Sequence, residues 1–212
     1  MSRPLVTGAI SVAISAAISA LALVLFVGTA SAQDYYGKQA PHVRNGLQLG
    51  FGIGGGDIDC SNCDAGLDAF GADFHVGKMF SPNLSIGGQV WTMRNSEDID
   101  IGIGPEFTTN LFHTIITANA QYWVLPRLWL RGGVGLAYVS VSIEGDGISA
   151  EAQSEAGLGV MAGFGYEVLT TRTFALDLEM QFGAGFYANE DDPTMDDVEA
   201  RNVSIGLGFT WF

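Results

Sequence analysis

The strongest constraint on this chain is an alternation of apolar residues with small or polar ones, which is clearest in its last segment. That segment reads NVSIGLGFTWF, from Asn202 to Phe212. Every second residue from Val203 to Trp211 is large and apolar, and the residues between them are small or polar. Successive side chains of a β-strand point to opposite faces, so the pattern predicts a strand with two unlike faces. Because exposed ends fray, we expect a partner strand and apolar surroundings to hold this segment.

Seven earlier segments repeat this alternation, which gives eight predicted strands. They cover residues 46–54, 69–80, 84–93, 112–124, 128–143, 156–168, 174–187 and 202–212. Glycine accounts for 29 of the 212 residues and proline for only 6, while 48% of the residues are hydrophobic. This composition fits many short strands better than helices.

Short breaks alternate with long polar stretches between the predicted strands. The short breaks surround Pro82, Pro126 and Arg172, and the longer stretches are rich in Asp, Glu, Gly and Ser. Tight turns that alternate with long loops are typical of an up-and-down antiparallel barrel with one rim in the periplasm and one outside the cell.

One face of the predicted strands is apolar, with Lys78 at a strand end as its single charge. In a soluble sandwich or a lipocalin-like barrel the apolar face would point inward. Three features favour an apolar exterior instead. The small face is rich in glycine, which relieves crowding inside a narrow barrel, and the strands reach the roughly ten residues that a tilted membrane crossing needs. Aromatic residues also gather beside the short breaks, as in an interfacial girdle: Phe80, Tyr122, Tyr166, Phe174 and Trp211.

The beginning of the chain has the pattern of an export signal. Arg3 precedes an apolar run over residues 5–27, and an Ala-Ser-Ala site follows at residues 30–32. The pattern predicts a cleaved signal peptide over residues 1–32, a periplasmic N-terminal segment over residues 33–45 and a barrel over residues 46–212. The apolar run is also long enough to span a bilayer, so an uncleaved membrane anchor is the alternative.

Taken together, the export signal, the eight alternating strands, the short turns and the terminal GLGFTWF resemble the small outer-membrane β-barrels of the OmpA and OmpX type. The resemblance covers residues 33–212 and rests on a pattern, not on a catalytic motif. It implies an all-β fold, an eight-stranded antiparallel up-and-down transmembrane barrel in the outer membrane of a Gram-negative cell. It also implies contact with outer-membrane lipids and lipopolysaccharide, and insertion by the barrel-assembly machinery. We expect no cofactor.

Six ionisable residues lie on the predicted inner face. They are Asp73, His75, Arg131, Glu167, Asp177 and Glu179. Buried charges must pair or hydrate, so we expect Arg131 to bridge Glu167, Asp177 or Glu179 across the lumen. Two interpretations stay open, a structural network that fills a narrow interior and a charged constriction that governs ion passage.

Two residues separate Cys60 from Cys63 in the first long polar stretch. No helix follows them, and no second Cys pair or nearby His completes a zinc site, so we expect a local disulfide in this exported chain. Asp57, Asp59 and Asp64 have a spacing similar to that of a calcium loop. The central Gly and the final Glu of such a loop are missing, so no metal site is predicted.

The charge of the chain is strongly negative and unevenly distributed. The formal net charge is -14, and most of the 23 acidic residues fall in the four long polar stretches. This balance excludes a nucleic-acid binder that works by neutralising phosphates. The acidic rim is either simply solvated or contacts lipopolysaccharide or another partner, with divalent cations bridging carboxylates to phosphates.

These features predict an integral outer-membrane barrel with a structural or surface-interaction role through acidic extracellular loops. A narrow cation-biased pore for small solutes is the alternative. A lipid-modifying enzyme is a third hypothesis, which would need an aligned His and Ser. His113 has no evident partner in the sequence and His42 lies in the N-terminal segment, so we expect no enzymatic activity.

Overall fold

The computed structural model describes residues 44–60, 67–99, 107–145, 148–153, 156–187 and 198–212. Nine β-strands form in these ranges: β1 (Leu47–Cys60), β2 (Leu67–Ser81), β3 (Leu84–Ile99), β4 (Phe107–Trp123), β5 (Leu128–Gly145), β6 (Ile148–Gln153), β7 (Gly157–Thr170), β8 (Phe174–Tyr187) and β9 (Val198–Trp211). In this part of the chain no helix has the length and hydropathy to cross a bilayer.

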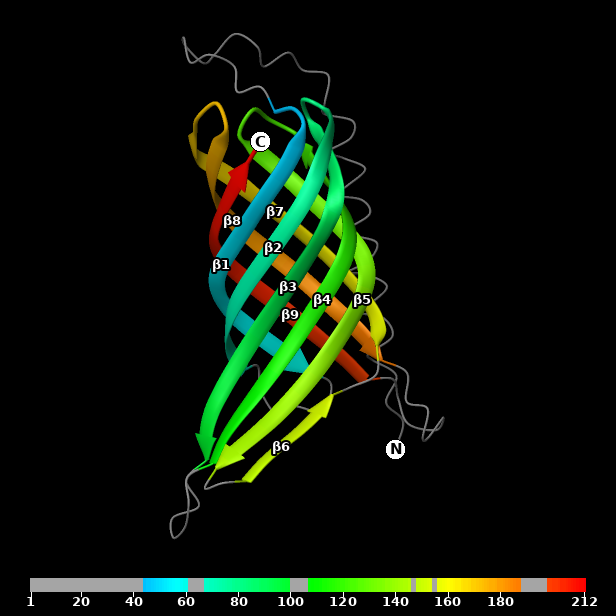
Figure 1. Ribbon diagram of the computed structural model, residues 1–212, viewed down its shortest axis with the longest axis vertical. Helices are drawn as coiled ribbons and strands as arrows, with labels where there is room; N and C mark the ends of the chain where they lie inside the picture. Colours follow the sequence, from blue (N-terminus) through cyan, green and yellow to red (C-terminus); the bar gives the residue numbers. More distant parts are fainter. Residues whose placement is uncertain (1–43, 61–66, 100–106, 146–147, 154–155, 188–197) are drawn as a thin grey trace, which may run out of the picture. The chain divides into compact units, whose positions relative to one another are not determined.

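Eight of the strands close into an antiparallel barrel (Figure 1). Around the wall the order is β4, β3, β2, β1, β9, β8, β7 and β5, and β5 pairs with β4 to complete the circle. The seam between the first and last strands places Phe51 opposite Phe209 and Leu49 opposite Trp211. The predicted eight-stranded up-and-down barrel is therefore confirmed, and its last strand closes it.

The apolar face of the strands points outward, as predicted. Val134 on β5 is 62% exposed and Phe74 on β2 is 54% exposed, whereas Gln89 and Gln181 are buried inside. A soluble barrel would show the reverse arrangement. An apolar outer wall with a polar interior is the arrangement of a barrel that crosses a lipid bilayer.

The two ends of the barrel differ. Three short turns, at residues 82–83, 124–127 and 171–173, lie at the end that also holds Phe212, at the top of Figure 1. We call this the short-turn end and the opposite one the long-loop end. The five predicted girdle residues lie toward the short-turn end, where the rings of Phe174 and Trp211 are 5.5 Å apart.

At the long-loop end the strands are longer than predicted. β3 continues to Ile99 instead of residue 93, and β4 begins at Phe107 instead of residue 112. Backbone pairing continues there, between Asn95 and Leu111 and on to Ile99, after the apolar alternation has ended. The apolar alternation therefore predicted the membrane-crossing part of these strands but not their polar extensions. Several acidic residues that were predicted to lie in loops are on strands, namely Asp57, Asp59, Asp68, Glu97, Glu144, Glu151 and Glu199.

β6 is a strand that the sequence did not predict. Among the described strands it pairs with β5 alone, from Ser140 opposite Gln153 to Gly145 opposite Ile148, while the first half of β5 pairs with β7. Its sequence, ISAEAQ, is only six residues long and has one large apolar side chain, so its strand signal is weak. Beyond the barrel wall, β6 and the ends of three barrel strands make a small sheet, at the bottom of Figure 1. We call this the outer sheet: residues 95–99 of β3, 107–111 of β4, 140–145 of β5, and β6.

Candidate functional site

The lumen holds most of the ionisable residues that the sequence singled out, so it is the first candidate site. At the short-turn end Arg44, from the segment before β1, inserts into the barrel mouth and is only 6% exposed. Its Nη2 donates to Glu167 Oε2 at 2.6 Å and to the Pro126 carbonyl at 2.7 Å, and its Nε donates to Glu167 Oε1 at 3.2 Å. The negative charge of Glu167 is therefore balanced by a guanidinium group from outside the strands.

Aromatic rings surround this ion pair. Trp123 Nε1 donates to Glu167 Oε1 at 2.6 Å, and the Arg44 guanidinium carbon lies 4.6 Å from the centre of the Trp123 ring. Phe212 packs its ring against Trp123 with centroids 5.9 Å apart. We call Arg44, Trp123, Glu167 and Phe212 the mouth cluster. Since Arg44, Trp123 and Glu167 are buried against one another at the mouth, the cluster obstructs the short-turn end of the lumen.

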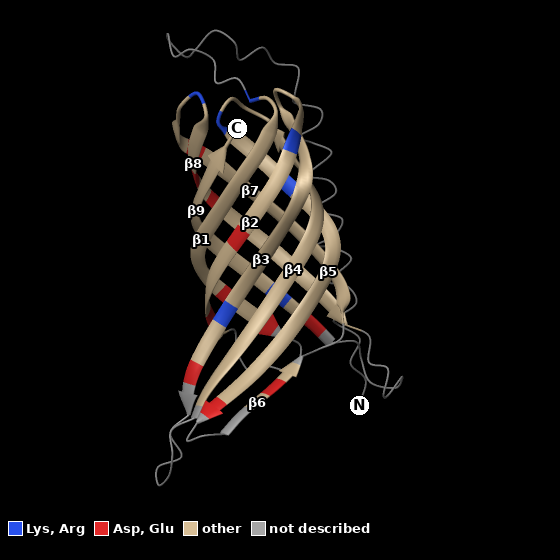
Figure 2. Cartoon of the chain, in the orientation of Figure 1, with Lys and Arg blue, Asp and Glu red and all other residues tan. Residues whose placement is uncertain are grey.

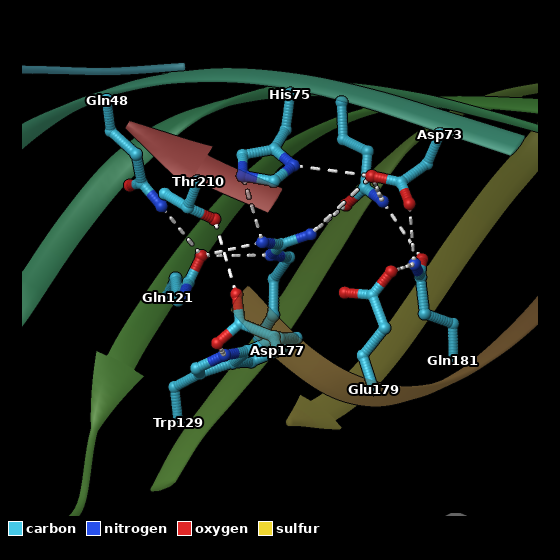
Figure 3. Close-up of polar contacts among 11 residues, drawn as sticks. Gln48, Asp73, His75, Gln121, Trp129, Asp177, Glu179, Gln181 and Thr210 are labelled. Carbon is cyan, nitrogen blue, oxygen red and sulfur yellow. Dashed lines mark hydrogen bonds and ion pairs between the residues drawn. The ribbon is translucent and has the colours of Figure 1, made fainter. Parts of the chain in front are cut away.

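Asp177 lies next to the mouth cluster and accepts two hydrogen bonds. Trp129 Nε1 donates to its Oδ1 at 3.3 Å, and Thr210 Oγ1 donates to its Oδ2 at 3.4 Å (Figure 3). The Arg131 guanidinium lies over the face of the Trp129 ring, with its central carbon 4.7 Å from the ring centre. Trp129 therefore connects Asp177 to the central part of the lumen.

Arg131 is the centre of a larger network in the middle of the barrel. Its Nε and Nη2 donate to Gln121 Oε1 at 3.1 and 2.7 Å, and its Nη1 donates to Gln89 Oε1 at 3.2 Å. Nη2 also lies 3.4 Å from His75 Nε2. Its ion pair is with Asp73, at 4.0 Å from Nη1 to Oδ1. The guanidinium is thus satisfied mainly by neutral amide oxygens.

Two glutamine amides connect Asp73 to Glu179. Gln89 Nε2 donates to Asp73 Oδ1 at 3.1 Å and to Gln181 Oε1 at 2.9 Å. Gln181 Nε2 donates to Asp73 Oδ2 at 3.0 Å and to Glu179 Oε1 at 3.1 Å, as Figure 3 shows. His75 Nδ1 lies 3.3 Å from Asp73 Oδ1. We call Arg131 and these partners the central network.

The prediction for the ion-pair partner of Arg131 is wrong. We expected it to bridge Glu167, Asp177 or Glu179, but within the described residues its ion pair is with Asp73, and Glu167 pairs with Arg44. Arg44 precedes the predicted strands, so strand parity gave no reason to place it in the lumen. The six predicted residues all point inward, and they divide between the mouth region and the central network.

Apolar side chains occupy the lumen on the other side of the central network. Trp91, Met93 and Ile115 are almost fully buried there, together with Ala137 and Tyr187. We call this group the apolar cluster. Sequence reasoning treated the inner face as uniformly polar and missed the cluster. The available signal was that Trp91 and Met93 have the parity opposite to that of Ile86 and Val90 on the apolar face.

Between the central network and the apolar cluster the side chains leave a cavity of about 10 Å³. Asp73, Trp91, Glu179, Gln181 and Ser204 are among the residues that line it. A space of this size holds about one water molecule. The buried side chains of the central network and the apolar cluster fill the described part of the lumen around this cavity, as expected for an eight-stranded barrel.

The other predicted sites give a mixed outcome. His113 is fully buried in the lumen, and its Nδ1 lies 2.6 Å from Asn202 Oδ1, a neighbour that the sequence did not indicate. Cys63 and the Cys60 side chain lie outside the described residues, as do Asp64, His42 and the predicted signal peptide. No group of three or more His, Cys, Asp and Glu side chains in the described ranges is arranged to hold a metal ion.

Known proteins agree with this architecture. Residues 19–210 match the family model of the outer membrane protein beta-barrel domain. The chain belongs to this family. The apolar wall of this outer membrane barrel consequently faces the lipids of the outer membrane. A search of curated protein sequences finds no significant match.

Solved structures show the same fold for this family member. The attachment invasion locus protein Ail of Yersinia pestis, in complex with the heparin analogue sucrose octasulfate, is similar with a TM-score of 0.52 and 14% identity, over 79% of this chain and 99% of Ail. Neisserial surface protein A is similar with a TM-score of 0.50 and 15% identity, over 78% of this chain and 96% of that protein. At these identities the likeness concerns the fold.

Proposed function

We propose that this outer membrane barrel has a surface-interaction role, in which the outer sheet contacts other molecules at the cell exterior. The observation that supports this proposal is the extension of β3, β4 and β5 past the barrel wall, with β6 added beside β5. Barrels of this class turn their short connections to the periplasm and their long ones to the outside. The outer sheet then projects from the cell surface.

The outer sheet has two edges at which another chain could pair. One edge is β3, whose backbone pairing with β2 ends at Arg94. The other edge is β6, which among the described strands pairs only with β5. Backbone N–H and C=O groups at such an edge can hydrogen-bond to an extended segment of another protein. The edges therefore supply affinity that depends little on the partner's side chains.

Charge narrows the choice of partner. The side chains of Glu97, Glu144 and Glu151 on the outer sheet are exposed. Carboxylates favour a basic segment, or an anionic surface such as lipopolysaccharide when divalent cations bridge the two. Sucrose octasulfate, the ligand in the Ail complex, carries negative charge, and exposed carboxylates would repel it. The partner class that we propose is cationic or cation-bridged.

This role can be tested by binding a basic probe to the protein in lipid nanodiscs. A fluorescent octalysine peptide should bind, and higher salt should weaken the binding. The triple variant Glu97→Gln, Glu144→Gln, Glu151→Gln should bind about tenfold more weakly, since exposed ion pairs contribute roughly 0.5 kcal/mol each. Glu179→Gln, inside the lumen, is the matched control and should bind as the wild type does. Equal binding by the triple variant would contradict the proposal.

The narrow cation-biased pore is the second candidate, and the packing of the lumen counts against it. The mouth cluster and the apolar cluster both lie across the path that ions would take, and the cavity between them has room for about one water molecule. A lipid-modifying enzyme also finds little support, because His113 is buried in the lumen and paired with Asn202. Assembly by the barrel-assembly machinery stays a prediction.

A further inference from the structure

In the described residues the exposed acids lie toward one end of the barrel, whereas Lys and Arg residues occur toward both ends (Figure 2). At the short-turn end Lys78 and Arg172 are exposed and Arg127 is half-exposed. The described acidic residues at that end, Glu167 and Asp177, are buried in the lumen. The exposed and half-exposed acids of the described ranges lie toward the other end: Asp57, Asp59, Asp68, Glu97, Glu144, Glu151 and Glu199. The outer rim of the short-turn end is consequently basic in the described part of an otherwise acidic protein.

The three basic residues are distributed evenly over the short connections. Lys78 is near the end of β2, before the first short turn, Arg127 is in the turn between β4 and β5, and Arg172 is in the turn between β7 and β8. These hairpins lie at different places around the closed sheet. We call Lys78, Arg127 and Arg172 the basic collar, because one of them lies in or near each of the three short connections at this end.

Each member of the basic collar lies within three residues of a large exposed apolar side chain. Phe80 follows Lys78, Leu125 precedes Arg127, and Leu169 precedes Arg172, and all three apolar side chains are more than half exposed. An apolar side chain beside a basic one is suited to a bilayer interface, where the apolar group meets acyl chains and the base meets headgroups. The pattern occurs at all three short connections.

We propose that the basic collar binds the phosphate headgroups of anionic phospholipids in the periplasmic leaflet of the outer membrane. The short turns of this barrel class face the periplasm, so the collar lies at the level of those headgroups. A protein or a polymer partner would approach one side and would need its charges in one patch. Lipids surround the barrel, and a ring of three separated cations fits lipids better than it fits one large partner. This inference concerns the end opposite the outer sheet, so it does not depend on the proposed surface-interaction role.

The test is native mass spectrometry of the detergent-solubilised barrel with equal amounts of phosphatidylglycerol and phosphatidylcholine. We expect the wild type to retain phosphatidylglycerol preferentially. Each of Lys78→Gln, Arg127→Gln and Arg172→Gln should lower that preference about fivefold, which corresponds to the attraction of one basic residue to an anionic surface. The triple variant should show no preference.

A matched control neutralises the two arginines toward the long-loop end. Arg94→Gln with Arg201→Gln removes charge from the same barrel and should leave the preference unchanged, as should the triple Gln variant of the outer sheet. Resistance of each folded band to SDS before boiling confirms that the variant is folded. An unchanged preference in the collar triple variant, or an equal loss in the control, would overturn the proposal. Stronger retention of lipid A through the same three residues would also overturn it, because lipid A belongs to the other leaflet.

Discussion

Arg44 forms a two-pronged ion pair with Glu167, a residue 123 positions further along the chain. The distances are 2.6 Å from Nη2 to Oε2 and 3.2 Å from Nε to Oε1, and both side chains are buried. The pair joins the segment before β1 to β7 across the barrel mouth. Gly46, which has a φ of 82°, lies between Arg44 and β1 and adopts a backbone conformation that favours glycine.

Removal of Arg44 should destabilise the barrel strongly. Arg44→Ala leaves the carboxylate of Glu167 buried without its cation, and such a change costs about 3 kcal/mol in the free energy of unfolding. Urea unfolding of the protein in lipid vesicles measures this cost. Arg172→Ala is the matched control, since Arg172 is exposed, and it should change stability by less than about 0.5 kcal/mol. Similar values for the two variants would show that the ion pair has no structural role.

Arg131 should tolerate lysine poorly. The guanidinium reaches Gln121 through two nitrogens and Gln89 through a third, and an ammonium group cannot reproduce this fork. We expect Arg131→Lys to lower the free energy of unfolding by about 2 kcal/mol, because hydrogen bonds to charged groups contribute roughly 1.5–3 kcal/mol. Lys78→Arg, on the outer face, is a control of the same chemistry. Full stability of Arg131→Lys would contradict the geometry of the central network.

The seam between β1 and β9 should not accept a side chain at Gly206. A Cβ there would overlap the carbonyl oxygen of Ile53 and would lie 2.7 Å from the Cα of Gly54. Gly206→Ala should therefore lower stability by about 1–3 kcal/mol and reduce the fraction of heat-resistant folded band on SDS gels. Gly55→Ala is the matched control across the same seam, since its Cβ would meet nothing within 4 Å. Equal folding of the two variants would disprove the close approach.

Trp91 should be the main packing residue of the apolar cluster. Trp91→Ala removes a ring that is 2% exposed, and truncation of a buried large aromatic costs about 3–5 kcal/mol. Unfolding by urea in vesicles reports the change. Phe74→Ala, on the lipid-facing side of β2, provides the comparison and should cost less, because lipid can fill the space. A larger loss for Phe74→Ala would mean that the lumen is not a packed interior.

The sequence determined the fold because the physical signals were local. A period of two in Val203, Ile205 and Leu207 specifies a strand and its faces, and the short breaks specify which neighbours pair. The same parity placed Asp73 and Arg131 in the lumen. Parity gives the face of a residue, however, and not its height or its rotation around the barrel, which depend on the stagger between strands. The pairing partners of Arg131 could not be derived for this reason.

Other features had no local signal at all. Arg44 belongs to no alternating segment, so its place in the mouth cluster follows only from the folded chain. β6 is only six residues long and two of the three residues on its apolar face are alanines, and the polar ends of β3 and β4 lack the alternation that marks a membrane-crossing strand. Trp91 and Met93 have the parity of the inner face, but the predicted inner face was defined by its glycine, polar and ionisable residues, so an apolar cluster there was not predicted.

The central claim of this account is that the lumen is packed shut, so that function belongs to the exterior of the barrel. Single-channel conductance of the refolded protein in a planar bilayer tests this claim most directly. With insertion verified by resistance to added protease and by the heat-resistant band, the account predicts no discrete conductance steps for the wild type or for Arg131→Ala. Reproducible cation-selective steps in the wild type, altered in size or selectivity by Arg131→Ala, would contradict it and make the central network a constriction.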